Sequence, residues 1–411
     1  MNIRSITCFA NPHWPVNEPA LAHIQSLIAA ARPAFESAGY TVQTTRLATI
    51  PFPNLLADLR VDEVVNLAQV IEKAAKSAGF DYLSLGPANP DLPDSYGVIP
   101  EVLRATQAVF LSGIIASQDA GVSLPAVRSC ARVIQQTAGI SPDGFGNLRF
   151  AALANVSPGA PFFPAAYHAG GTPAFALATE AADLAVEACS SASSLAEARQ
   201  NLVSVLEGHA RVLTAVGNDL AGEYQVEFSG IDFSLAPFPE EARSIGAALE
   251  RLGISSVGQH GTLAAVAFLA EAIDRARFRR VGFSGVMLPV LEDAVLADRA
   301  ARGLLSVTDL LLYSAVCGTG LDTIPLPGST TEEELAAVLL DLAVLAQRLN
   351  KPLTARLMPV PGKSAGDPTG FDFDYVANSV VLPLRSSPLS GLLSGGESFE
   401  IQGIGQRGHK R

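Results

Sequence analysis

Short runs of apolar and β-branched residues alternate along this chain with longer runs rich in alanine and leucine. This alternation limits the possible folds more than any other feature. Residues 2–10 read NIRSITCFA, which predicts a strand, and residues 18–39 carry a helical spacing of apolar residues that ends at Gly39. The pattern repeats with a strand over 40–49 and a helix over 61–79. Such alternation is typical of α/β proteins, so we predict an α/β fold.

The same reading extends to the end of the apolar body without a clean linker or an internal repeat. Further strands are predicted over 81–86, 107–115, 149–155, 225–233, 351–362 and 373–384. Residues 155–173, dense in proline, glycine and aromatic residues, form a long irregular segment that we expect at the edge of the body and to be functional. We therefore predict one domain over 1–384 and a mobile, serine- and glycine-rich tail over 385–411.

Composition excludes two classes of partner. Hydrophobic residues make up 48% of the chain and charged residues 17%, which favours a large buried core. The net charge is −12, and the one basic cluster, RARFRR at 275–280, is typical of a solvated helix end. Nucleic acid is therefore not an expected partner. No stretch is apolar over the roughly 18 residues that a membrane helix needs, so a membrane is not expected either.

The cysteines give no sign of a metal or disulfide framework. Cys8, Cys130, Cys189 and Cys317 lie far apart, and no pair has the CxxC spacing of zinc or redox motifs. A long chain with few, scattered cysteines predicts a reduced protein. Together with an N-terminus that lacks the pattern of a signal peptide, this predicts a cytoplasmic location.

The familiar motifs of nucleotide-binding proteins, zinc proteases and serine hydrolases are missing, so the candidates are isolated polar residues at strand ends. In α/β proteins such ends are where sites form. The five candidates for catalysis are Cys317, His168, His260, Asp232 and Asp322. Cys317 directly precedes Gly-Thr-Gly, where a thiol is a nucleophile, a radical relay, a metal ligand or a small buried apolar residue.

The two histidines each have a structural alternative. His168 follows a tyrosine and precedes Gly-Gly, so it is either a general base or a histidine bonded to a loop carbonyl. His260 stands where a helix begins, which favours a neutral imidazole. That position suits acid/base chemistry, and it equally suits a cap of the helix.

Four carboxylates are candidates for a divalent cation. They are Glu227, Asp232, Glu292 and Asp293. Carboxylate oxygens favour Mg²⁺ or Ca²⁺ over Zn²⁺, although no spacing demands a metal. Asp232 lies in an apolar strand and alternatively accepts backbone N–H groups, and Glu292 and Asp293 alternatively begin a helix.

Several segments together resemble a known family. The runs VEFSGIDFSLAPFP, GISSVGQHGTLAAVAFL, GFSGVMLPVLEDAVL and AVCGTGLDTIPLPG, and upstream RFAALANVSPGAPFFPAAYHAGG, stand in the order typical of the uncharacterised protein family 0210, also called domain of unknown function 711. The resemblance covers about residues 1–382. It implies a fold like that of pyruvate formate-lyase and other glycyl radical enzymes, a closed ten-stranded α/β barrel surrounded by helices with a hairpin loop inside.

By that analogy CGTG is the inner loop and Cys317 its tip. The chain departs from glycyl radical enzymes at its C-terminus, which reads SGGESFEIQGIGQRGHKR and lacks the motif of the radical glycine. Radical chemistry is therefore not expected, and the family brings no assigned reaction.

Three functions follow from these observations. The first is a non-radical enzyme acting on a small polar metabolite in the barrel, for which at least three of the candidate groups must share a pocket. The second is a metabolite-binding or regulatory protein on an inactive barrel. The third is a structural oligomer with an apolar interior. The alanine-rich apolar helices also predict a homo-oligomer.

Overall fold

The computed structural model of this protein describes residues 1–404, and the side chains of Glu18 and Ala20 are left out of the description. It is a mixed α/β structure built on a sheet of 11 strands. Along the sheet, the order is β8 (Glu227–Asp232), β7 (Ala174–Glu180), β1 (Asn2–Phe9), β2 (Val42–Ala48), β3 (Tyr82–Ala88), β4 (Val109–Ser117), β6 (Phe150–Ala154), β10 (Leu353–Val360) and β9 (Gly320–Pro327). The predicted α/β class is confirmed.

The sheet contains blocks of parallel strands joined by antiparallel pairs. Strands β1 to β4 and β6 run parallel to one another, β7 runs parallel to β8, and β9 runs parallel to β10. The pairs β1–β7 and β6–β10 are antiparallel. Strand direction in the sheet therefore changes twice, between β7 and β1 and between β6 and β10. On one side of the molecule, N-terminal ends of some strands thus lie beside C-terminal ends of others.

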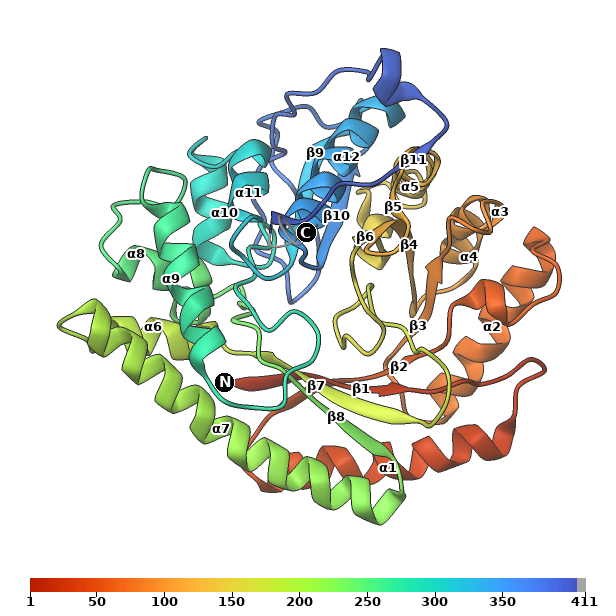
Figure 1. Ribbon diagram of the computed structural model, residues 1–411, viewed down its shortest axis with the longest axis horizontal. Coiled ribbons are helices and arrows are strands. Elements are labelled where there is room, and N and C mark those ends of the chain that lie inside the picture. The colour runs from red at the N-terminus through yellow and green to blue at the C-terminus, as the bar shows by residue number, and fades with distance from the viewer. Residues whose placement is uncertain (405–411) are drawn as a thin grey trace, which may run out of the picture.

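Twelve α-helices are assigned in the described part of the chain. They are α1 (Glu18–Ser37), α2 (Val61–Ser77), α3 (Asp94–Gly97), α4 (Ile99–Ala105), α5 (Leu124–Ala138), α6 (Ala182–Ser190), α7 (Leu195–Tyr224), α8 (Ile245–Arg251), α9 (Thr262–Arg275), α10 (Ala294–Ala301), α11 (Val307–Tyr313) and α12 (Glu332–Leu349). Figure 1 shows them outside the strands, which curve around a common centre. Within residues 1–404, no helix has the length and apolar character needed to cross a bilayer.

Apolar faces of these helices account for the core. In α2, Val64, Leu67 and Ile71 recur at helical spacing and are buried, whereas Asp62, Glu63 and Lys76 of the same helix are exposed. Strand β10 is buried along its whole length, which fits a strand covered on both faces. The main hydrophobic cluster runs from Ile3 to Leu382, so the apolar core is continuous along most of the chain.

The two outer strands of the sheet path are linked through a segment without regular strand structure. Leu235, just beyond β8, forms a parallel bridge with Val286, and Pro289 forms another with Asp322 in β9. Glycines allow this close approach, since a Cβ on Gly318 would stand 2.9 Å from the Cα of Gly285. The Gly318 N–H donates to the Val286 carbonyl at 2.7 Å. The turn after Cys317 is therefore glycine-rich because two backbones touch there.

The segment over 155–173 lies inside the curved sheet and not at its edge, which corrects the expectation from sequence. Phe163 packs with residues of β1, β2, β4 and β7 in one buried cluster. Two strand hydroxyls, those of Thr7 and Ser84, donate to the carbonyls of Pro161 and Ala166. Figure 1 shows this segment, in olive, inside the curve of the strands. CGTG itself stands at the start of β9.

One expectation for the C-terminal part changes. Residues 373–384, predicted as a strand, contain none and form an irregular segment with one isolated antiparallel bridge, from Val380 to Pro368. The described part of the tail contacts the body, where β11 (Ser398–Phe399) pairs with β5 (Gly121–Ser123), and its mobility stays a prediction. Arg128 also donates to the Gly395 carbonyl at 2.8 Å. Residues 405–411 of the tail lie outside the described residues.

Candidate active site

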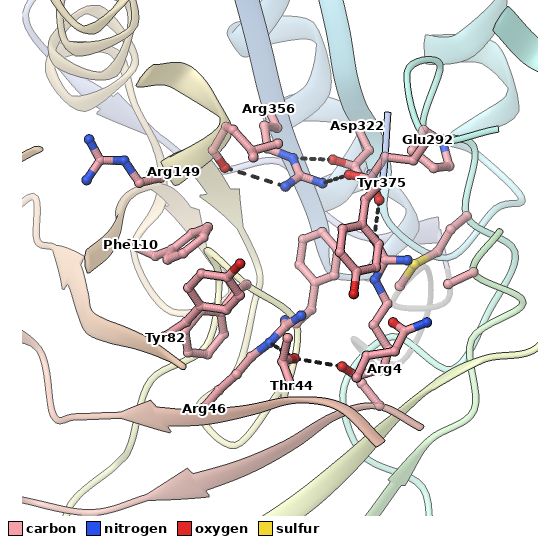
Figure 2. A pocket seen from close by; sticks show the side chains of 18 of the residues that line it. Arg4, Thr44, Arg46, Tyr82, Phe110, Arg149, Glu292, Asp322, Arg356 and Tyr375 are labelled. Carbon is pink, nitrogen blue, oxygen red and sulfur yellow. Dashed lines mark hydrogen bonds and ion pairs between the residues drawn. The ribbon is translucent and has the colours of Figure 1, made fainter. Parts of the chain in front are cut away.

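A cavity of about 380 Å³ opens where strand ends of opposite polarity meet. Its walls come from β1, β2, β3, β4, β7, β8, β9 and β10, from the inner segment over 155–173, and from the irregular residues around 287–292 and 373–376. Figure 2 shows its polar side chains converging from these elements. A cavity of this size accommodates a small organic molecule.

Arg356 anchors one side of the cavity. Its Nε donates to Asp322 at 2.6 Å and its Nη2 donates to Glu292 at 2.9 Å (Figure 2). Burial lowers the pKa of Arg356, but the two carboxylates outweigh it and raise this pKa above its ordinary value. The three side chains are nearly inaccessible to water, so each charge depends on the others for compensation.

The same network continues through a second arginine. Arg4 bonds to the other oxygen of Glu292, and it contacts Glu180 at 3.4 Å. Glu180 is buried and is also paired with Arg243. In order, this network runs through Arg243, Glu180, Arg4, Glu292, Arg356 and Asp322. Arg243 also lies 3.7 Å from the exposed carboxylate of Glu240. From Arg243 inward, positive and negative groups alternate and match in number.

Arg46 differs from the other arginines that point into the cavity. Its Nε donates to Thr44 Oγ1 at 2.9 Å, and no carboxylate of the described residues lies within ion-pairing distance of it. Its guanidinium instead lies 5.1 Å from the ring centre of Phe163 and 5.9 Å from that of Tyr82. Burial, reinforced by the charge of Arg4, lowers the pKa of Arg46 to about 10, so it is still a cation at neutral pH.

Arg149 also borders the cavity but serves the backbone. It donates to the carbonyls of Leu103 and Thr106, the latter at 2.9 Å. Figure 2 shows its guanidinium turned away from the centre of the cavity. Burial lowers its pKa. Arg149 therefore fixes the backbone just before β4, and its guanidinium is not available to bind a ligand.

Aromatic rings form most of the remaining wall. Tyr82 and Phe110 pack edge to face with ring centres 5.3 Å apart, and Phe110 packs in the same way on Phe163. Phe373 and Tyr375, whose ring centres lie 5.3 Å apart, form another part of the wall. The hydroxyls of Tyr82 and Tyr375 make no hydrogen bond within residues 1–404 and border the cavity (Figure 2). Burial raises the pKa of Tyr82, which keeps its hydroxyl protonated at neutral pH.

Three acidic residues singled out from the sequence line this cavity, namely Asp232, Asp322 and Glu292. Asp232 accepts bonds from the Phe283 N–H, the Ser284 N–H and the Ser234 hydroxyl, which is the structural role considered for it. Burial raises its pKa, and these donors partly offset that effect. Asp232 and Asp322 are thus the two members of the predicted catalytic set that the structure brings together.

Cys317 does not line the cavity. It is 4% exposed and belongs to the main hydrophobic cluster. Its N–H donates to the Tyr313 carbonyl, and its own carbonyl accepts from Lys351 Nζ. The structure thus places Cys317 as a small buried residue behind the sheet, without the pocket partners that a nucleophile needs.

The two histidines are separated from the cavity as well. His168 is buried near the end of the inner segment. Its backbone N–H donates to the Thr49 carbonyl, and its side-chain Nε2 lacks a partner in the described part of the chain. His260 is exposed, and α9 begins two residues later. The pocket that we expected to hold three of the predicted catalytic groups therefore holds two.

The other metal candidates have structural partners. Glu227 is exposed and pairs with Arg279. Asp293 is the N-cap of α10 and also accepts from Ser244 Oγ and the Ile245 N–H, so it joins two helix starts. No group of three or more His, Cys, Asp or Glu residues within 1–404 is arranged to hold a metal ion. The structure thus supplies no ligand set for Mg²⁺ or Ca²⁺ in this part of the chain.

Sequence reasoning missed the arginines that organise the site, although a signal was present. Arg46 interrupts YTVQTTRLAT and Arg356 interrupts KPLTARLMPV, both of which read as strands. A charged residue in a buried strand requires a partner or a ligand. That rule alone would have added both residues to the candidates.

The chain matches one protein family over most of its length. The sequence profile of the family described as Uncharacterised ACR (DUF711) matches residues 1–376. The chain belongs to this family. A UPF0210 protein of Neisseria gonorrhoeae is 29% identical over 364 residues, covering 84% of this chain and 80% of that protein. A UPF0210 protein of Oleidesulfovibrio alaskensis is 29% identical over 393 residues, covering 90% of this chain and 86% of that protein.

These DUF711 relatives carry no reaction in their names, so the family confirms the resemblance seen in the sequence and leaves function to the site. The match covers every strand of the sheet path from β1 to β10 and residues 373–376 of the cavity wall. The tail from residue 385 lies beyond it.

Proposed function

We propose that this DUF711 protein is a non-radical enzyme that acts on a small organic anion held in the cavity by Arg46. The observation that carries the proposal is a guanidinium pointing into a cavity of about 380 Å³ with no carboxylate partner among the described residues. A partly buried charge without a partner is costly, so this position favours a ligand of opposite charge. A small-molecule partner was also the expectation from sequence.

The remaining polar groups have roles that suit turnover. Tyr82 is a protonated donor beside Arg46 and is the candidate general acid. Asp322 and Glu292 are held by Arg356 in a fixed position at the cavity wall and are the candidate acceptors of a proton. Cys317, His168 and His260 have no role in this mechanism.

We also infer that the sheet closes into a ten-stranded barrel around this site. The bridges of Leu235 with Val286 and of Pro289 with Asp322 support closure, because the segment between them would serve as the tenth strand. The position of the inner segment supports the same inference. Its tip is Pro161-Phe162-Phe163-Pro164, and a segment without a thiol is in keeping with non-radical chemistry.

A binding protein without turnover is the second candidate. It is favoured by one observation, namely that neither cysteine nor histidine lines the cavity within the described residues. Both candidates need Arg46, so the first experiment asks whether an anion binds there and the second asks whether it is consumed.

The test is equilibrium dialysis of the full chain against a mixture of small organic acids, comparing wild type, Arg46→Met and Arg104→Met. Arg104 is an exposed arginine paired with Glu101 and serves as the control. We expect Arg46→Met to weaken anion binding by about 10- to 100-fold, since a hydrogen-bonded ion pair contributes about 1.5–3 kcal/mol. Equal binding by wild type and Arg46→Met would refute the proposal.

Prolonged incubation then separates the two candidates. Loss of the bound acid with appearance of a product, abolished in Tyr82→Phe while binding persists, supports the enzyme. Recovery of the acid unchanged supports the binding protein. Unchanged unfolding midpoints in urea show that each variant is folded.

A further inference from the structure

We propose that the ligand of this cavity is a monocarboxylate with a flat apolar body, rather than a phosphate ester or a short polar acid. This inference rests on the proposed function and adds the substrate class. It is carried by the charge balance of the cavity, by the free donors of Arg46 and by the rings that form the walls.

The charge balance leaves room for one negative charge. The network from Arg243 to Asp322 contains three arginines and three carboxylates and is internally compensated. Asp232 is held by backbone N–H groups and Ser234, and Arg149 is held by backbone carbonyls. The guanidinium of Arg46 is then the group without a partner, and a single carboxylate matches its charge.

The geometry of Arg46 also selects a carboxylate. Its Nε is used by Thr44, whereas Nη1 and Nη2 make no hydrogen bond within residues 1–404. Two adjacent N–H groups form the fork that binds both oxygens of one carboxylate. A phosphate dianion would need a second uncommitted cation, but Arg4 and Arg356 are already shared among Glu180, Glu292 and Asp322.

The walls indicate the body of the ligand. Tyr82, Phe110 and Phe163 form a continuous set of edge-to-face contacts beside Arg46. Phe373 and Tyr375 form a second pair of rings on the cavity wall, where Tyr375 also lies 5.6 Å from the Arg4 guanidinium. Two sets of rings from different parts of the chain offer stacking and edge contacts to a flat apolar group. A short acid such as propionate would leave these walls uncovered.

Four probes separate head group from body, measured by isothermal titration calorimetry on the full chain. They are 3-phenylpropionate, propionate (the same head without the ring), 3-phenylpropanamide (the same body without charge) and phenethyl phosphate (the same body with a dianionic head). We expect 3-phenylpropionate to bind at least about ten-fold tighter than each of the others. In Arg46→Met this preference over the amide disappears, whereas Arg104→Met retains it.

Each other result overturns the inference in a recognisable way. Equal or tighter binding of phenethyl phosphate would mean that the head group is not a monocarboxylate, and equal binding of propionate would mean that the body is not recognised. In both cases dependence on Arg46 would leave the proposed function standing. No binding of any probe at millimolar concentration would overturn the inference, and the acid mixture of the dialysis experiment would then decide the proposed function by itself.

Discussion

Two arginines on strands, Arg356 and Arg46, have different partners in this molecule. Arg356 is 5% exposed and meets two carboxylates, whereas Arg46 meets a hydroxyl and aromatic rings. The sequence places both in buried strands and so marks them as unusual. It does not say which one is compensated, because Asp322 and Glu292 come from distant parts of the chain. This is the part of the site that local patterns do not predict.

Two acidic candidates, Asp232 and Asp322, were predictable from their positions in the sequence. Asp232 and Asp322 each end or enter a strand, and strand ends gather at one side of a sheet. Cys317 and His260 also stand in glycine-containing turns but lie elsewhere. Cys317 precedes β9 and is buried in the main hydrophobic cluster, and His260 lies between α8 and α9, where no strand of the described chain ends. Local sequence does not show which of these turns borders the cavity.

His168 gives a prediction for pH dependence. Burial lowers its pKa below the ordinary value of about 6.5, and a backbone hydrogen bond at Gly171 only partly offsets this. When the pH falls below about 6.5, His168 takes up a proton in the unfolded chain but not yet in the folded chain. Stability therefore falls as the pH drops through this window, with a slope of up to about 1.4 kcal/mol per pH unit, and levels off below the folded pKa.

The measurement is the free energy of unfolding in urea, from about pH 8 to about pH 5, for wild type, His168→Gln and His260→Gln. The difference between wild type and His168→Gln should shrink as the pH falls. His260→Gln, at an exposed site, should follow wild type. A difference that is constant over this range would contradict the prediction.

At the level of elements, periodicity predicted most helices and strands. The strand expected over 2–10 is β1, and the helix over 18–39 is α1. The inner segment was recognised as long and irregular but placed outside, because composition does not reveal that strand hydroxyls and rings surround it. The strand expected over 373–384 is absent. The alternating pattern there reflects ring contacts of Phe373 with Phe145 and of Tyr375 with Phe238.

The contact between the turn after α11 and the segment before Val286 gives an element-scale prediction. A Cβ at position 318 would lie 2.9 Å from Gly285 Cα and 3.0 Å from the Val286 carbonyl oxygen. We expect Gly318→Ala to destabilise the fold by about 1–3 kcal/mol, because neither backbone can move away easily. Urea unfolding measures the change.

Gly208 in α7 is the matched control for that substitution. A Cβ there has no neighbour within 4 Å, so Gly208→Ala should be neutral or stabilise the helix by up to about 1 kcal/mol. Equal effects of the two substitutions would show that the close approach at Gly318 is not what requires glycine.

For the whole molecule, three expectations stay predictions, namely a single domain over 1–384, self-association and a cytoplasmic location. Large apolar residues that are exposed in the described chain, such as Leu195 and Leu312, are spread over different helices and identify no partner.

The tail yields the prediction at this scale. Removal of residues 385–411 would take away β11 and the packing of Leu389 and Phe399 against the core. We expect a loss of about 1–4 kcal/mol in unfolding free energy, since each of these side chains is only partly buried. Binding at the cavity should be unchanged because none of the tail residues that the structure describes, 385–404, borders it. A truncated chain as stable as the full one would support the mobile tail expected from sequence.

The antiparallel junction of β6 with β10 has a consequence for how this protein is made. Leu353 pairs with Ala154, so β6 is synthesised about 200 residues before its partner. At roughly 5–20 residues per second, the edge of β6 waits on the ribosome for roughly 10–40 s with its N–H and C=O groups unpaired. An emerging chain with an open strand edge is a substrate for chaperones and a nucleus for aggregation. Slowing synthesis between these two strands should lower the yield of folded protein.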